Sequence, residues 1–128
     1  MKRIPLNSSS SSSPILIVAG PHDFYDRDVI SNALVDMICD IQPTKIITGD
    51  SKGVDQVVAE LCHGLQEIEY ERYYANYDKF RKSAKVIRDY QMALVGTHLL
   101  IFYNETMRLN SMLYYAEHEN LKIKKIKI

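Results

Sequence analysis

The chain has few of the residues and patterns that would assign it to several common classes of protein. Its 128 residues include two cysteines, Cys39 and Cys62, without CxxC or metal-ligand spacing, so the sequence indicates neither a disulfide framework nor a zinc site. The histidines at positions 63, 98 and 118 also lack metal-ligand spacing. We therefore expect no metal and no cofactor, and the reducing setting of the cytoplasm.

Long apolar stretches and net charge are missing as well. No apolar run approaches the ~18 residues of a membrane-spanning helix, and the polar N-terminal segment lacks the apolar centre of a signal peptide. Lys and Arg total 16, as do Asp and Glu, which gives no electrostatic support for a nucleic-acid partner. These absences favour a cytoplasmic protein whose partner is neither a membrane nor a nucleic acid.

What is present is the composition of one globular domain. Apolar residues make up 46% of the chain and charged residues 25%. Residues 8–13 are all serine, and nothing apolar there offsets the entropy lost when a segment becomes ordered. We therefore expect a flexible, serine-rich tail at 1–13 and a single domain at 14–128.

The domain alternates between strand patterns and helix patterns. Apolar runs predict buried strands, and alternating charges predict a more exposed strand at 68–75. The lysines at 121–128 predict an edge strand, with a polybasic binding tail as the alternative interpretation. The buried strands are expected at 15–19, 45–48 and 98–103. Asp26 is expected to cap a helix that ends near Ile41, and further helices are expected at about 54–65, 78–94 and 108–119. This order predicts an α/β fold, a parallel sheet with helices on both faces.

The helix expected at 78–94 carries two kinds of surface. The residues of its predicted apolar face are Phe80, Ala84, Ile87, Gln91 and Leu94. Beside this face, Arg81, Lys85 and Arg88 form a basic strip that could reach over the mouth of a pocket. A solvated basic surface is the alternative interpretation of the strip.

Glycine-containing loops follow the first two strands, at 20–23 and 49–53. In a parallel sheet, ligands bind beyond the carboxyl ends of the strands, so we expect both loops side by side on one rim. The second loop leads into a helix N-terminus, where free backbone N–H groups favour an anion. A tight turn with nothing bound explains the same spacing equally well.

Three blocks of sequence, taken together, resemble a known family. They are VAGPHDF at 18–24, TGDSKGVD at 48–55 and SAKVIRDYQM at 83–92. In order and spacing they are similar to the YspA-like family of the SLOG superfamily, which also contains the DprA proteins and the LOG-type cytokinin-activating hydrolases. The similarity covers nearly all of 15–128. It implies a Rossmann-like three-layer sandwich, with a mostly parallel sheet of about five strands, that binds a nucleotide or a nucleotide-derived small molecule and occurs in bacteria and phages.

The resemblance also implies which residues surround the ligand. Gly20 and Asp23 match the family's first loop, and Gly49, Gly53 and Asp55 match its second loop. Arg88 matches the basic residue of the long helix. The ligand-binding residues expected on this basis are Gly20, His22, Asp23, Gly49, Ser51, Lys52, Gly53, Asp55 and Arg88.

Several positions differ from the family pattern. His22 and Lys52 stand where the family has arginine, and Pro21 removes one backbone donor. Family glycines are replaced by Asp50, Arg81 and Lys85, and a family asparagine by Asp89. Asp50 and Asp55 oppose an anion at the second loop, whereas they could accept hydrogen bonds from the hydroxyls or amines of a ribose or base.

The residues that would carry catalysis in the family are not retained. Residues 104–109 contain no glycine, where the family has a second glycine turn, and Met112 stands where the LOG-type hydrolases have a catalytic glutamate. We therefore expect a module that binds or senses its ligand, and we assign no catalytic residue. DNA binding of the DprA kind has little electrostatic support in a neutral chain.

Two other interpretations stay open at this stage. One is an enzyme that hydrolyses or transfers an N-glycosidic bond and depends on Asp55 or Asp23. The other is a degenerate, non-catalytic module that acts through protein contacts, including a homo-oligomer, with its pocket filled by Lys85 or Arg108. Tyr74 and Tyr77 follow the third strand and are candidates for stacking on a base or for a subunit contact.

Overall fold

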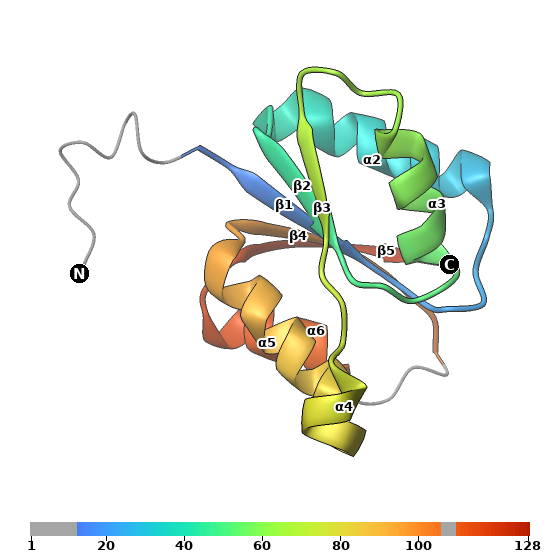
Figure 1. Ribbon diagram of the computed structural model, residues 1–128. Helices are drawn as coiled ribbons and strands as arrows, with labels where there is room; N and C mark the ends of the chain where they lie inside the picture. Colours follow the sequence, from blue (N-terminus) through green and yellow to red (C-terminus); the bar gives the residue numbers. More distant parts are fainter. Residues whose placement is uncertain (1–12, 106–109) are drawn as a thin grey trace, which may run out of the picture.

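A computed structural model describes residues 13–105 and 110–128, and it contains one parallel sheet of five strands (Figure 1). The strands are β1 Ile15–Ala19, β2 Lys45–Thr48, β3 Glu69–Arg72, β4 His98–Tyr103 and β5 Lys122–Lys127. Their order in the sheet is β3-β2-β1-β4-β5, and each neighbouring pair is parallel. The expected α/β fold, a Rossmann-like three-layer sandwich, is therefore confirmed. The expected tail at 1–13 lies almost wholly outside the described residues.

The helices cover both faces of the sheet. Figure 1 shows α2 (Arg27–Ile41) and α3 (Val54–Cys62) on one face, with α5 (Ala84–Val95) and α6 (Ser111–His118) on the other. Asp26 caps α2 as expected, because its side chain accepts a hydrogen bond from the backbone N–H of Val29 at 3.2 Å.

The position of β1 in the middle of the sheet explains why its sequence is apolar without interruption. Leu16 and Val18 of β1 pack with α2 and α3, whereas Ile17 packs with α5 and α6, and all three side chains are fully buried. Since successive side chains of a strand point to opposite faces, a strand covered on both faces needs an apolar residue at every position. Each such side chain contributes about 1.5–3 kcal/mol through burial.

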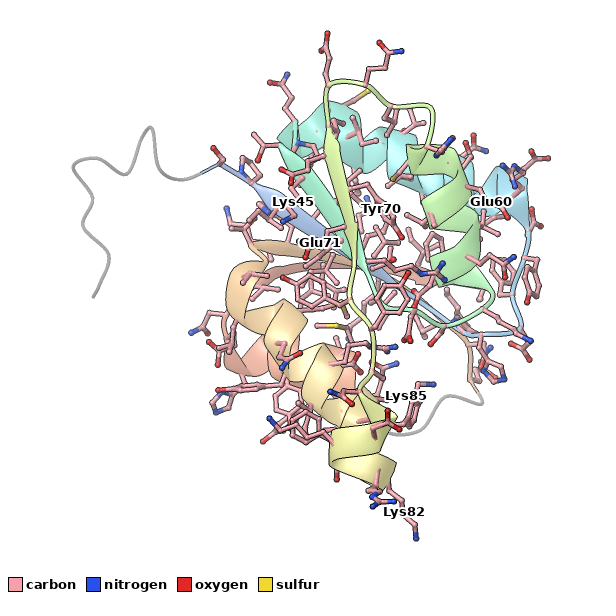
Figure 2. The ribbon with its side chains drawn as sticks, viewed as in Figure 1. Lys45, Glu60, Tyr70, Glu71, Lys82 and Lys85 are labelled. Atoms are coloured by element: carbon pink, nitrogen blue, oxygen red, sulfur yellow. The ribbon has the colours of Figure 1, made fainter. Side chains whose placement is uncertain are left out.

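Polar side chains mark the two edges of the sheet. In β3, Glu69 and Glu71 are exposed, and Figure 2 shows Glu71 beside Lys45 of the neighbouring strand β2, with their charged atoms 2.5 Å apart. At the other edge, the lysines of β5 are exposed. Exposed charges discourage another chain from pairing with an edge strand, so the predicted role of the lysines at 121–128 agrees with their position.

The prediction of a continuous helix at 78–94 is wrong. The segment consists of α4 (Tyr77–Phe80), a 3-10 turn at Arg81–Ser83 and then α5. The break lies at Arg81, whose φ of 53° and ψ of −123° place it outside the helical region. This conformation suits glycine better than a residue with a Cβ.

The buried face expected for this helix is confirmed at Ala84 and is wrong at Gln91 and Leu94. Leu94 is 54% exposed and Gln91 is exposed, whereas Arg88 and Asp89 are buried together with Ala84, Met92 and Ala93. Two charged side chains replace apolar ones on the inner face because they pair with each other, as described below. The helix expected at 108–119 begins at Ser111 in the described part of the chain; residues 106–109 lie outside it.

Candidate functional site

A pocket of about 440 Å³ lies where the loops after the central strands diverge. The chain passes from β1 to β2 on one side and reaches β4 on the other, so β1 and β4 flank the topological switch point of the sheet. The loop residues Gly20 and Asn104, which follow these strands, line the pocket together with residues of α5 and the start of α6. This is where ligands bind in open parallel sheets.

The two glycine loops lie side by side, as expected. The carbonyl oxygen of Pro21 accepts a hydrogen bond from the backbone N–H of Val54, the first residue of α3, at 3.2 Å. Gly53 has a φ of 69°, and a Cβ there would lie 2.4 Å from that same carbonyl oxygen. Glycine is therefore required at position 53 so that one loop can pack against the other.

Arg88 lies directly against the second glycine loop. Its side chain is 6% exposed, and a Cβ at Gly49 would come within 2.5 Å of the guanidinium carbon. Nη1 donates to Asp50 at 2.5 Å, while Nη2 and Nε donate to Asp89 at 3.0 and 3.3 Å. Burial lowers the pKa of Arg88, but the charge and hydrogen bonds of Asp89 and the hydrogen bond of Asp50 outweigh it and raise the pKa above its ordinary value.

Asp89 continues this network to the other helix of the pocket. Its second carboxylate oxygen accepts a short hydrogen bond from the hydroxyl of Ser111, the first residue of α6. Asn110 caps the same helix by accepting a hydrogen bond from the backbone N–H of Leu113 at 2.9 Å. The start of α6 is therefore attached to α5 through a buried, charged hydrogen-bond network.

Asp55 is the most buried carboxylate of the pocket. Its side chain is 4% exposed, and Oδ2 accepts a hydrogen bond from the backbone N–H of Ser51 at 3.2 Å. Burial raises the pKa of Asp55 to about 6, although the positive charge of Arg88 and the hydrogen bond from Ser51 act in the opposite direction. A carboxyl with such a pKa can exchange a proton close to neutral pH.

Arg72 of β3 holds the same loop from the far side. Its Nε donates to the carbonyl oxygen of Gly49 at 3.1 Å, and its Nη2 donates to that of Ser51 at 2.8 Å. Asp50 accepts a further hydrogen bond from the backbone N–H of Ala75 at 3.4 Å. The loop thus has a fixed shape before any ligand arrives, which lowers the entropic cost of binding.

The structure brings most of the expected site residues to one pocket. Those that line it are Gly20, His22, Asp23, Gly49, Ser51, Asp55 and Arg88. Lys52 lies instead in a neighbouring groove of about 400 Å³, together with Gln56 and His63 of the α3 side. Gly53 packs against the backbone of the first glycine loop and does not line the described walls of this pocket.

Other wall residues were not expected from the sequence. Asp89, Asn110 and Ser111 line the pocket, as does Met92. The one signal that could have singled out Asp89 is its place beside Arg88 in the basic strip of this helix, and nothing in the sequence marks Ser111. Lys85 does line the pocket, as the basic strip predicts, and Met112 lies in the wall.

Two further sequence predictions concern what fills or covers the pocket. With Lys85 in its wall, the pocket formed by the described side chains still has its open volume, and Arg108 lies outside the described residues. Tyr74 and Tyr77 are 69% and 55% exposed and do not line the described walls of the pocket at the switch point. Stacking on a base in this pocket would therefore need other residues.

The charge of the pocket is acidic on balance. Its described walls carry three carboxylates, from Asp23, Asp55 and Asp89, against the cations of Lys85 and Arg88. The guanidinium of Arg88 already donates to two carboxylates. Within residues 13–105 and 110–128, no group of three His, Cys, Asp or Glu side chains is arranged to hold a metal ion.

The fold and the pocket together define the class of this molecule: an α/β protein of Rossmann-like architecture with a polar pocket at the switch point of its sheet. Comparisons with protein-family models, with curated proteins and with solved structures found no match. None of the helices in the described part of the chain is long and apolar enough to cross a membrane.

Proposed function

We propose that this protein binds or senses a nucleotide or a nucleotide-derived small molecule at the switch-point pocket, as a divergent, cytoplasmic SLOG-type domain of bacterial or phage origin. One observation carries the proposal. Residues from three blocks far apart in the sequence, among them Gly20, Asp55 and Arg88, line a single pocket at the place where parallel sheets bind ligands. Its volume of about 440 Å³ lies within the ordinary range for small-molecule sites.

The construction of the pocket supports binding in a preformed site. Hydrogen bonds from Arg72 and Arg88 hold the second glycine loop, and Ser111 joins α6 to α5 through Asp89. The residues that make these contacts do not belong to the apolar clusters of the core. Buried charged networks are costly to assemble, and a binding site gives them a use that core packing does not.

The proposal is tested by thermal denaturation in the presence of nucleotides, ADP-ribose and cyclic nucleotides. A ligand at 100 times its dissociation constant stabilises the folded state by about 2.7 kcal/mol. Gly49→Ala is expected to abolish that stabilisation, because its Cβ would displace the Arg88 guanidinium. Gly64→Ala is the matched control, because a Cβ there meets only one carbonyl oxygen, at 3.9 Å. A well-folded protein that none of these compounds stabilises would contradict the proposal.

One observation favours a second candidate, an enzyme that cleaves or transfers an N-glycosidic bond. Burial raises the pKa of Asp55 to about 6, the range in which a carboxyl serves as a general acid or base. Release of free base from the bound nucleotide, followed by chromatography, tests this candidate. Asp55→Ala should then abolish release while the circular dichroism spectrum stays unchanged. A nucleotide that binds but is recovered intact would exclude it for that compound.

A further inference from the structure

We propose that the deep end of the pocket, formed by Asp55, Arg88 and Asp89, receives hydrogen-bond donors of an uncharged ligand group and not a phosphate. The donors would be ribose hydroxyls or the exocyclic amine of a base. The inference rests on the proposed function and specifies which part of the ligand enters first.

The charges at the deep end carry this inference. Arg88 is surrounded by Asp50 and Asp89, to which it donates hydrogen bonds, and its positive charge also acts on nearby Asp55. Arg72 also acts on Asp55, while its Nε and Nη2 donate to carbonyl oxygens of the second glycine loop. Two guanidinium groups therefore face three carboxylates. The Nε, Nη1 and Nη2 of Arg88 each already donate to a carboxylate oxygen. An arginine so occupied is a poor partner for a phosphate, which also meets uncompensated negative charge here.

Asp55 has acceptor capacity that no residue in 13–105 or 110–128 uses. The backbone N–H of Ser51 occupies Oδ2, and no other described residue donates a hydrogen bond to this carboxylate. No described side-chain oxygen is both fully buried and without a partner, so Oδ1 is accessible, and the cavity that Asp55 lines is the switch-point pocket. A carboxylate that is 4% exposed with a free oxygen in a pocket is suited to accept a donor from a ligand.

The backbone donors that would normally hold a phosphate at a glycine loop are partly consumed. The N–H of Val54, at the start of α3, donates to the carbonyl of Pro21, and the N–H of Ser51 donates to Asp55. Proline at position 21 has no N–H of its own. The anion cradle expected from the spacing of the second loop thus lacks two of its donors.

Cations are placed farther out. Lys85 is exposed in the pocket wall near the start of α5 (Figure 2), and Lys52 is exposed in the neighbouring groove. A ligand that enters with its hydroxyls or amine toward Asp55 would leave a phosphate, when it has one, on this outer side. The deep end selects the nucleoside part of the ligand.

Isothermal titration calorimetry of the full chain near neutral pH tests the inference. The probes are the four ribonucleosides, their 5′-monophosphates and inorganic phosphate, with Asp55→Asn as the variant. Asp28→Asn is the matched control, since Asp28 also lies in the first turn of a helix but is exposed on α2. We expect Asp55→Asn to weaken nucleoside binding about tenfold or more, because it removes a charged acceptor, and Asp28→Asn to leave it unchanged. A large excess of inorganic phosphate should not displace a nucleoside from the wild-type protein.

The sign of the Asp55→Asn effect decides between the two orientations. A phosphate at the deep end would bind more tightly once a negative charge is removed, so stronger binding of monophosphates or phosphate by the variant overturns the inference and leaves the proposed function intact. Unchanged nucleoside affinity in Asp55→Asn, or displacement by phosphate, also overturns it. If none of the probes binds, both the inference and the proposed function are contradicted. Among binding nucleosides, the 2′-deoxy forms and inosine, which lacks the amine of adenosine, distinguish hydroxyl donors from an amine.

Discussion

Asp55→Asn is expected to stabilise the protein above neutral pH, although it alters the centre of the pocket. Asp55 is 4% exposed, and burial raises its pKa from 3.8 to about 6. One pKa unit corresponds to about 1.4 kcal/mol, so the folded state disfavours the ionised carboxyl by about 3 kcal/mol relative to the unfolded state. Asparagine has nearly the same shape and cannot ionise.

The change in stability with pH follows from the raised pKa of Asp55. Between pH 3.8 and about 6, the folded protein binds a proton at Asp55 that the unfolded chain has released. Protonated Asp55 therefore contributes its full stabilisation below pH 3.8, the pKa of this carboxyl in the unfolded chain. The stabilisation is lost as the pH rises through about 6, the pKa in the folded protein. Because a carboxylate in the first turn of α3 gains about 0.5 kcal/mol from the helix dipole, the net gain of Asp55→Asn at about pH 8 is about 2–3 kcal/mol.

Urea denaturation, followed by circular dichroism at about pH 8 and at about pH 3.5, measures the gain in stability of the variant and its change with pH. The variant should exceed the wild type at the higher pH and match it at the lower one. Asp28→Asn, which removes an exposed first-turn carboxylate from α2, should show no such gain at either pH. An Asp55→Asn variant that is less stable than the wild type at about pH 8, or a difference that does not change with pH, would refute this reasoning.

Three further substitutions test the loops and the helix contacts, each by urea denaturation. Gly53→Ala should cost about 2 kcal/mol or more, because φ is 69° and the new Cβ would meet a loop carbonyl; a smaller loss would contradict the packing described. Arg81→Gly should gain about 1 kcal/mol by relieving a φ of 53°, whereas Lys82→Gly, at a neighbour without positive φ, should lose about 0.5–1 kcal/mol. Ser111→Ala should cost about 1–2 kcal/mol, since it removes the hydroxyl that donates to Asp89; no loss would mean that this contact does not hold α6.

The strands of this fold are readable from the sequence because burial on both faces leaves a simple pattern. Residues 15–19 and 99–102 are apolar without interruption, and the structure places β1 and β4 side by side in the interior of the sheet. The alternating charges of 69–72 predict a more exposed strand, and the structure places β3 at an edge of the sheet. The glycine loops follow from these strands, since their position at one rim is fixed by the parallel topology.

Arg88 and Asp89 show why part of the site could not be predicted. Hydrophobic periodicity assigns charged residues to the outer face of a helix, yet here both lie inward because they neutralise each other and bind Asp50 and Ser111. Those partners lie on other elements, so the compensation becomes visible only in three dimensions. Hydrophobic periodicity also does not predict the break at Arg81, because a single residue at positive φ leaves the apolar pattern on either side unchanged.

The proposed binding site is tested most directly by nuclear magnetic resonance of the 15N-labelled chain, titrated with the nucleoside or nucleotide that gives the largest thermal shift. Ligand binding at the switch point should move the backbone amide signals of Gly20, Gly49 and Ser51, and it should leave that of Gly64, at the end of α3, in place. Signals that move only around Lys52 and His63, in the neighbouring groove, or no movement with any ligand, would contradict binding in this pocket.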